Sequence, residues 1–201
     1  MLKHFFKRTA VALAMIFLII VYLCAGAVSL SLPNLNAQTV YFLVDSTDSV
    51  AASAEMISLR GGAGYVTSSG EVAFNVYFSR SEAEEIYKNL LGEYPNVELR
   101  TYVKYGDFDE EQGFLLSVIK TVESWGQVLK QGVSQERIRQ GLDELSALLR
   151  FRGERAKSSL CVELSKNLEQ TLDGIITMGK LRHFLCFATE RLWGVNEEVI
   201  I

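Results

Sequence analysis

Apolar and polar residues alternate along the segment 39–104 in short runs that are separated by turn-forming residues. Runs rich in β-branched and aromatic residues with a period of two are typical of strands, and two longer runs with a period near 3.6 are typical of helices. The predicted strands cover 39–44, 64–67, 72–78 and 97–103, and the predicted helices cover 49–59 and 79–91. The order is therefore β-α-β-β-α-β.

This order predicts an α+β fold of the ferredoxin-like type. Two split βαβ units would form one antiparallel sheet with both helices on a single face. Strict alternation assigns one set of side chains to the core, namely Val40, Phe42, Val44, Val72, Phe74, Val76, Val97 and Leu99. The other sheet face would carry Tyr41, Leu43, Ala73, Asn75, Tyr77, Arg100 and Tyr102. We place this domain at residues 38–105.

The segment 108–195 has the apolar period of helices throughout. Apolar stripes run along three stretches, which Gly132 and a break near Gly153 separate. Short connections between helices favour antiparallel neighbours, so the segment predicts a helical hairpin or a three-helix bundle. The second stripe contains Ile138, Leu142, Leu145, Leu148 and Leu149, and the third continues without a predicted break from Ala156 to Leu192.

A candidate membrane segment precedes these two regions. Residues 9–32 contain no charged side chain, and about 20 apolar residues suffice for a helix to cross a bilayer. Lys3, Lys7 and Arg8 precede the segment, so the positive-inside rule keeps residues 1–8 in the cytoplasm and places the rest outside. The sequence thus predicts a single-pass protein of the cell membrane with an extracytoplasmic C-terminal part.

Two other interpretations of the apolar segment differ in how it is processed. A cleaved signal peptide would use the small residues 25–27 as its cleavage site. A lipoprotein is less favoured, because Leu23 stands before Cys24 where processing requires a small residue. An uncleaved anchor is the preferred interpretation, since the apolar run continues through Val28, Leu30 and Leu32.

The charge distribution argues against nucleic acid as a partner. The chain has 20 Lys and Arg against 24 Asp and Glu, for a net charge of −4. Its first acidic residue is Asp45, so the part beyond the apolar segment is more acidic than the whole. A surface of that sign repels phosphate backbones.

Candidate catalytic and metal-binding motifs are weak. The glycines at 61–64 follow a helix, whereas phosphate-binding loops precede one. His183 and Cys186 would supply two metal ligands where zinc usually takes four, so core packing is preferred for Cys186, and free thiols are expected. The acidic residues Asp107, Asp109, Glu110 and Glu111 lie where a helix begins, so they favour capping over glycoside cleavage. No enzyme and no cofactor is predicted.

Two stretches of the predicted sheet resemble a SPOR (sporulation-related repeat) domain. Residues 40–46, an Ala-rich helix and residues 61–66 are similar to its first half, and residues 72–83 are similar to its second. The resemblance covers about 65 residues (39–104) and implies a bacterial envelope module that binds peptidoglycan glycan strands lacking stem peptides, in cell division, sporulation or envelope maintenance.

The resemblance directs attention to one face of the predicted sheet. Aromatic rings pack on the flat faces of sugars, while Asn and Arg donate directed hydrogen bonds to hydroxyl and acetamido groups. The candidate glycan-binding residues are Tyr41, Leu43, Asn75, Tyr77, Arg100 and Tyr102. The alternative is that the C-terminal helices bury these tyrosines. The second function hypothesis follows from it: an envelope interaction protein whose helical region docks a protein partner.

Overall fold

We describe the protein from a computed structural model, in which residues 37–194 are described. The predicted cytoplasmic tail (1–8) and membrane helix (9–32) lie outside these residues. Within the described part, no helix combines the length and the hydropathy needed to cross a bilayer. The described residues belong to one compact unit.

A four-stranded antiparallel sheet with two interleaved helices forms the first half of this unit. The strands and helices are β1 (Ala37–Asp45), α2 (Val50–Leu59), β2 (Tyr65–Val66), β3 (Val72–Tyr77), α3 (Arg80–Leu90) and β4 (Val97–Tyr105). The strand order in the sheet is β2-β3-β1-β4. The predicted α+β class and the predicted succession of these elements are confirmed.

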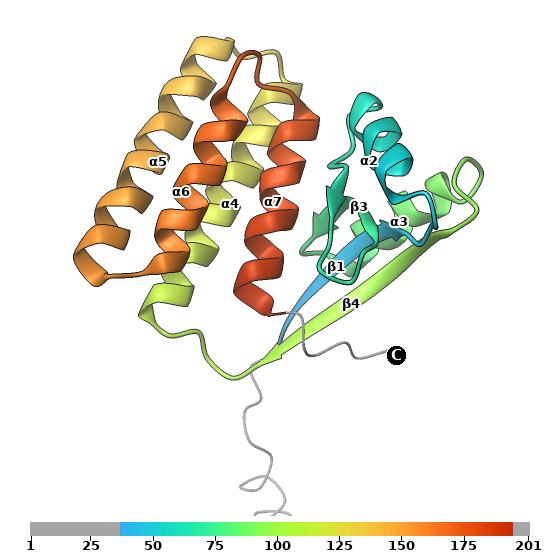
Figure 1. Cartoon of the computed structure of the whole chain (residues 1–201), viewed down its shortest axis with the longest axis horizontal. Helices are drawn as coiled ribbons and strands as arrows, with labels where there is room; N and C mark the ends of the chain where they lie inside the picture. Colours follow the sequence, from blue (N-terminus) through green and yellow to red (C-terminus); the bar gives the residue numbers. More distant parts are fainter. Residues whose placement is uncertain (1–36, 195–201) are drawn as a thin grey trace, which may run out of the picture. The chain divides into compact units, whose positions relative to one another are not determined.

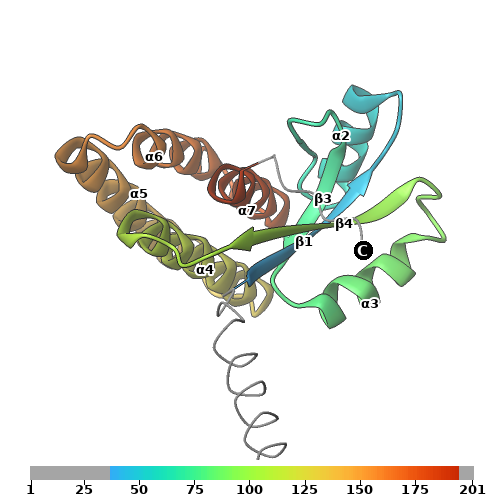
Figure 2. The same cartoon turned by 90° about the horizontal axis from the view of Figure 1, so that it is seen from below.

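The second half consists of helices. They are α4 (Glu110–Lys130), α5 (Gln135–Ala156), α6 (Ser159–Leu172) and α7 (Met178–Trp193). The helical region is confirmed, but the prediction of a hairpin or a three-helix bundle is wrong, since residues 110–193 form four helices. α7 packs against the sheet, while α5 and α6 lie on the side of the bundle away from it (Figures 1 and 2).

The extra helix comes from a break between α6 and α7. Gly174 has a φ of +64° there, a conformation that favours glycine. Side chains of α5 hold the loop: Arg139 donates to the carbonyls of Leu172 and Gly174, and Gln135 both donates to and accepts from the backbone of Ile176 at 2.9 and 3.1 Å. The break therefore depends on tertiary contacts that apolar periodicity does not reveal.

Side-chain caps define where most helices begin. Ser79, Ser134, Ser158 and Thr177 each accept a hydrogen bond from the backbone N–H three residues later. Asp109 forms a full capping box with Gln112 at the start of α4, as expected from the acidic residues there. The starts of α3, α4 and α5 were predicted from such local signals, whereas the start of α7 at Thr177 was missed.

Both faces of the sheet are buried. Val40, Phe42 and Val44 of β1 belong to a large apolar cluster with α4–α7. Leu43 belongs to a second cluster with residues of α2 and α3. In Figure 2 the sheet accordingly lies between the four-helix region and the α2–α3 pair. A near-continuous apolar run, as at residues 40–44, is what a strand buried on both sides requires.

The predicted core set divides between these two clusters. Val40, Phe42, Val44 and Val76 face the C-terminal helices, whereas Val72, Phe74, Val97 and Leu99 face α2 and α3. For β4 the reason is register: Leu99 pairs with Leu43 and Val97 with Asp45, and directly paired residues share a face.

For β3 the reason is a β-bulge. The pairing with β1 shifts between Leu43, which faces Asn75, and Val44, which faces Ala73. The extra residue, Phe74, is therefore left without a pair, and it packs in the same cluster as Tyr77, three positions away. Strict alternation cannot hold through such a bulge.

Candidate functional site

The six predicted glycan-binding residues do not lie on one surface. Tyr41, Leu43 and Tyr77 are on the side of α2 and α3. Leu43 is 0% exposed and Tyr77 8% exposed, while Tyr41 is half-buried. The cover over this group comes from α2 and α3, not from the C-terminal helices as the alternative interpretation had it.

Asn75 lies beside this group, at the bulge. It is half-buried, and its Oδ1 atom is buried without a hydrogen-bond partner among the described residues. Burial raises the pKa of Tyr77, and a side-chain hydrogen bond between Tyr77 and Asn75 opposes that rise. These side chains form a packed cluster and not an open platform.

Arg100 and Tyr102 lie on the opposite face of the sheet. Tyr102 pairs with Val40 across the strands and packs edge-on against Phe42, with ring centroids 5.3 Å apart. Arg100 forms ion pairs with Glu71 at 2.7 Å and with Glu98 at 2.9 Å. The arginine is thus committed to carboxylates of its own chain.

The interface of α7 with the edge of the sheet is tightly packed. Tyr65 donates a hydrogen bond to Glu190, and the backbone N–H and the hydroxyl of Ser68 both donate to the same carboxylate at 2.8 Å. His183 contacts the carbonyl of Ala63 through Nδ1 at 3.2 Å. Desolvation by burial, followed by the hydrogen bond to Glu190, raises the pKa of Tyr65 far above its usual value. The polar groups of this interface bind one another.

Neither thiol of the described region is placed for chemistry. Cys161 and Cys186 are free and buried, and burial raises the pKa of the Cys186 thiol far above its usual value, which keeps it protonated. Across residues 37–194, no three His, Cys, Asp or Glu side chains come together in a way that could hold a metal ion.

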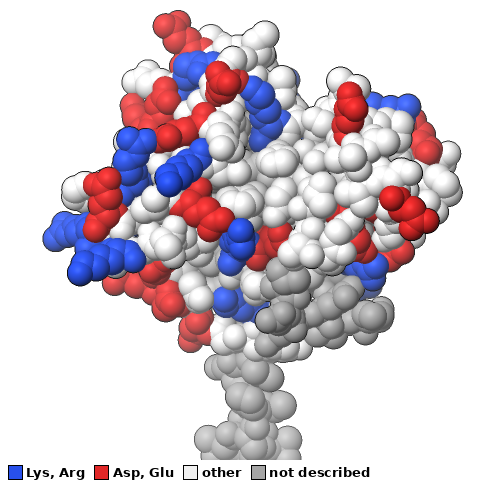
Figure 3. All heavy atoms as spheres, viewed as in Figure 1, with Lys and Arg blue, Asp and Glu red and all other residues white. Residues whose placement is uncertain are grey.

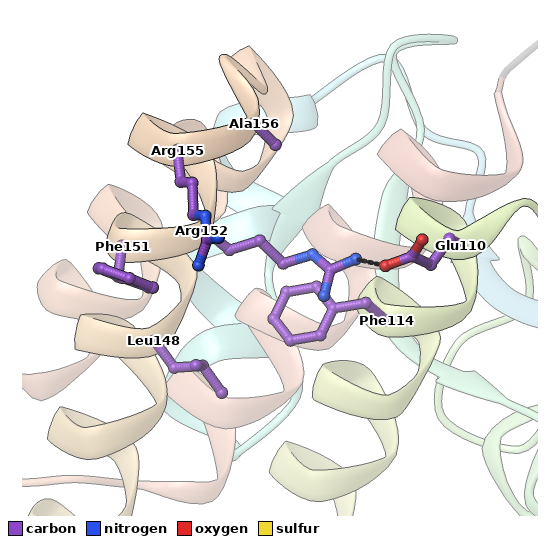
Figure 4. A pocket seen from close by; sticks show the side chains of 7 residues that line it. All are labelled: Glu110, Phe114, Leu148, Phe151, Arg152, Arg155 and Ala156. Atoms are coloured by element: carbon purple, nitrogen blue, oxygen red, sulfur yellow. Dashed lines mark hydrogen bonds and ion pairs between the residues drawn. The ribbon is translucent and has the colours of Figure 1, made fainter.

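A hollow of the helical region lies between α4 and α5. We call it the α4–α5 groove; it has a volume of about 470 Å³ and lies where α4 begins and α5 ends. Figure 4 shows its lining side chains, which are Glu110, Phe114, Leu148, Phe151, Arg152, Arg155 and Ala156.

Large apolar side chains are exposed at this groove. Phe151 is 61% exposed and Leu148 48% exposed, whereas Ile138, Leu142 and Leu149 on the same helix are buried. Single exposed apolar residues are common on protein surfaces, whereas exposed apolar side chains that lie next to one another mark interaction sites. Phe151 points away from the bundle in Figure 4.

Charged side chains surround the apolar pair. The guanidinium of Arg152 lies over the ring of Phe114, 4.4 Å from its centroid, and donates to Glu110 at 2.9 Å. Arg155 also lines the groove and forms no ion pair with any residue from 37 to 194. On the face shown in Figure 3, basic and acidic side chains are interspersed over the helical region.

Comparisons with protein-family models, curated proteins and solved structures found no match to this chain. The groove must therefore be interpreted from its own geometry and chemistry.

Sequence patterns missed this site, although they contained a signal. Leu148 was assigned to the apolar stripe of the second helix, yet the buried stripe of α5 runs through Ile138, Leu142, Leu149 and Gly153. Leu148 and Phe151 fall off that stripe by about 100° or more at 100° per residue. An apolar pair outside the buried stripe is the sequence signature of an exposed patch.

Proposed function

We propose that this protein is a non-enzymatic interaction module of the bacterial envelope, anchored in the membrane by residues 9–32, whose α4–α5 groove binds a helix of a protein partner. The observation that carries the proposal is the exposed Phe151 and Leu148 beside a hollow of about 470 Å³. The anchor itself is a prediction from the sequence.

The chemistry of the groove defines what it would bind. Phe114, Leu148 and Phe151 offer apolar contact, and Arg155 at the rim offers a guanidinium that forms no ion pair within residues 37–194. A partner helix that presents an apolar side chain next to a carboxylate satisfies both groups. Arg152 is less available, because Glu110 already neutralises it.

The sheet provides the scaffold in this proposal. Its strand order and its interleaved helices support a split βαβ, ferredoxin-like arrangement, consistent with the resemblance to SPOR domains. One face of this sheet packs against the C-terminal helices, which fixes α4 and α5 through α7. Binding of glycan strands to the sheet stays a prediction, with less support, because Leu43 and Tyr77 are buried.

The proposal is tested by site-specific photo-cross-linking in cells. The full-length chain is produced at its native level with a photo-reactive amino acid in place of Phe151. We expect an adduct of one defined mass, whose yield falls when Arg155→Glu is added. Asp143 is the matched control position, since it is exposed on α5 about 100° away from the groove stripe.

Two outcomes contradict this function. One is the absence of any adduct from position 151 when the protein is folded and present at its normal level. The other is an equal adduct from position 143, which would mean non-specific contact. Mass spectrometry of the adduct identifies the partner in the remaining case.

A further inference from the structure

The exposed side of α5 has a symmetric sequence. Leu148 and Phe151 form its centre, Glu144 stands four residues before Leu148, and Arg155 stands four residues after Phe151. All four side chains are exposed. The spacing of 4, 3 and 4 residues is that of a helix seam that packs against another helix.

These four residues lie on one side of the helix. At 100° per residue they fall within about 60° of one another around the α5 axis. The opposite side carries the buried residues Ile138, Leu142 and Leu149, which pack in the core. The seam therefore points away from the core and has no cover among residues 37–194.

We propose that the α4–α5 groove is occupied by a second copy of this chain, through an antiparallel pair of α5 helices related by a two-fold axis between Leu148 and Phe151. The inference rests on the proposed function and names the partner. In this arrangement Phe151 packs against the partner subunit's Leu148 and enters the hollow beside the partner subunit's Phe114.

Charge complementarity selects a second copy and sets the direction of the pair. Because the spacing is symmetric, an antiparallel partner brings the partner subunit's Arg155 opposite Glu144, and the reverse contact forms at the other end. Both groups are available: among residues 37–194, Glu144 accepts only an amide hydrogen bond from Gln140 at 3.1 Å, and Arg155 forms no ion pair. A parallel pair would place like charges together.

Apolar contact and charge have separate roles in such an interface. The central Leu148 and Phe151 supply the buried area, with Arg152 stacked on Phe114 as a wall of the hollow. The two outer Glu144–Arg155 contacts are exposed, so they set register and direction more than affinity. Because the two copies are identical, a charge reversal at Glu144 or at Arg155 alters both of these contacts in the dimer.

The test uses the full-length chain in detergent micelles and measures mass against protein concentration by light scattering coupled to size-exclusion chromatography. We expect a concentration-dependent dimer for the wild type. Glu144→Arg and Arg155→Glu should each weaken it by about tenfold or more, because each variant places like charges opposite one another at both ends. Phe151→Asp should abolish it.

Mixing the two reversed variants is the decisive step. A Glu144→Arg chain paired with an Arg155→Glu chain regains opposite charges at both ends, so the mixture should form a heterodimer near wild-type affinity, detected with two different tags. Asp143→Arg, the same change one residue away and off the seam, should leave the dimer unchanged. Circular dichroism confirms that each variant is folded.

Three results would overturn the inference: a wild type that stays monomeric, a dimer that neither reversal weakens, or reversed variants that do not pair when mixed. An adduct from position 151 to a different protein, together with a monomeric wild type, would leave the proposed function standing and this inference wrong. If position 151 gives no adduct and Phe151→Asp leaves the dimer intact, both the proposed function and this inference are wrong.

Discussion

Glu71, the residue before β3, accepts hydrogen bonds from three directions. Ser46 and Ser69 donate to it at 2.9 and 3.0 Å, and Arg100 donates at 2.7 Å. Burial by itself would raise the pKa of Glu71, but the hydrogen bonds from Arg100, Ser46 and Ser69 outweigh it and lower the pKa below its ordinary value of 4.5. One carboxylate therefore ties the β1–α2 turn and β4 to the β2–β3 turn.

The lowered pKa predicts how stability depends on pH. The contribution of Glu71 is fully present above about pH 4.5, the unfolded value, and is lost as the pH falls below it through the folded value. Glu71→Gln should cost about 1–3 kcal/mol at neutral pH, the range for hydrogen bonds to charged groups, and much less in acid. Urea unfolding at pH 7 and pH 3 measures both, and an equal loss at the two pH values would contradict the assignment.

Substitutions of Tyr77 and Tyr41 distinguish a role in core packing from a role in glycan binding. With 8% exposure in the cluster beneath α2 and α3, Tyr77→Ala should destabilise the protein by about 3–5 kcal/mol, as large-to-small changes in cores do. Tyr41→Ala removes a half-buried ring from the same face at lower cost. Thermal melting and binding to amidase-treated sacculi are measured on both variants.

The glycan prediction then has a clear criterion. If glycan strands bind this face, Tyr41→Ala should reduce retention on denuded sacculi while the protein melts nearly normally. Retention that is unchanged, or that is equal on treated and untreated sacculi, would contradict it.

Between elements, α5 and α6 approach each other closely at Gly153. A Cβ atom there would lie 3.0 Å from the backbone nitrogen of Val162 and 2.7 Å from its side chain. Gly153→Ala should thus destabilise the protein by about 1–3 kcal/mol, the range for overpacking.

Gly113 provides the matched control for this prediction. It lies in α4 with open space around its Cβ position, so Gly113→Ala should stabilise by roughly 0.5–1 kcal/mol through helix propensity. Calorimetric melting of the two variants should therefore shift in opposite directions. A Gly153→Ala variant as stable as the wild type would mean that α5 and α6 can separate at little cost.

Helices and strands also show how much of the structure the sequence pattern can predict. Strands, the helices between them and most helix starts depend on local signals, such as the Asp109–Gln112 capping box, and were found. The bulge at Phe74 depends on pairing with β1, and the break at Gly174 depends on contacts from Arg139. Neither feature interrupts the alternating or periodic pattern of apolar residues in the sequence. The candidate glycan face failed to assemble because of the pairing of β4 with β1: Arg100 pairs with Phe42 and Tyr102 with Val40, so both lie on the face opposite Tyr41 and Leu43.

At the scale of the whole chain, orientation in the membrane follows from the basic residues at its start. A reporter fused after Ile201 of the full-length chain should be active only outside the cytoplasm, because Lys3, Lys7 and Arg8 favour retention of the N-terminus inside. Replacing these three by Glu should weaken the preference. Activity of the reporter in the cytoplasm would contradict the envelope location.

Synthesis order gives the α7–sheet contact a further consequence. The four strands are complete at Tyr105, but the helix that covers the Val40, Phe42 and Val44 face ends at Trp193. About 90 further residues must be made first, which takes roughly 4–18 s at usual elongation rates. During that interval the chain lacks the helix that covers this apolar sheet face, so we expect the unfinished domain to be bound by chaperones until α7 is made.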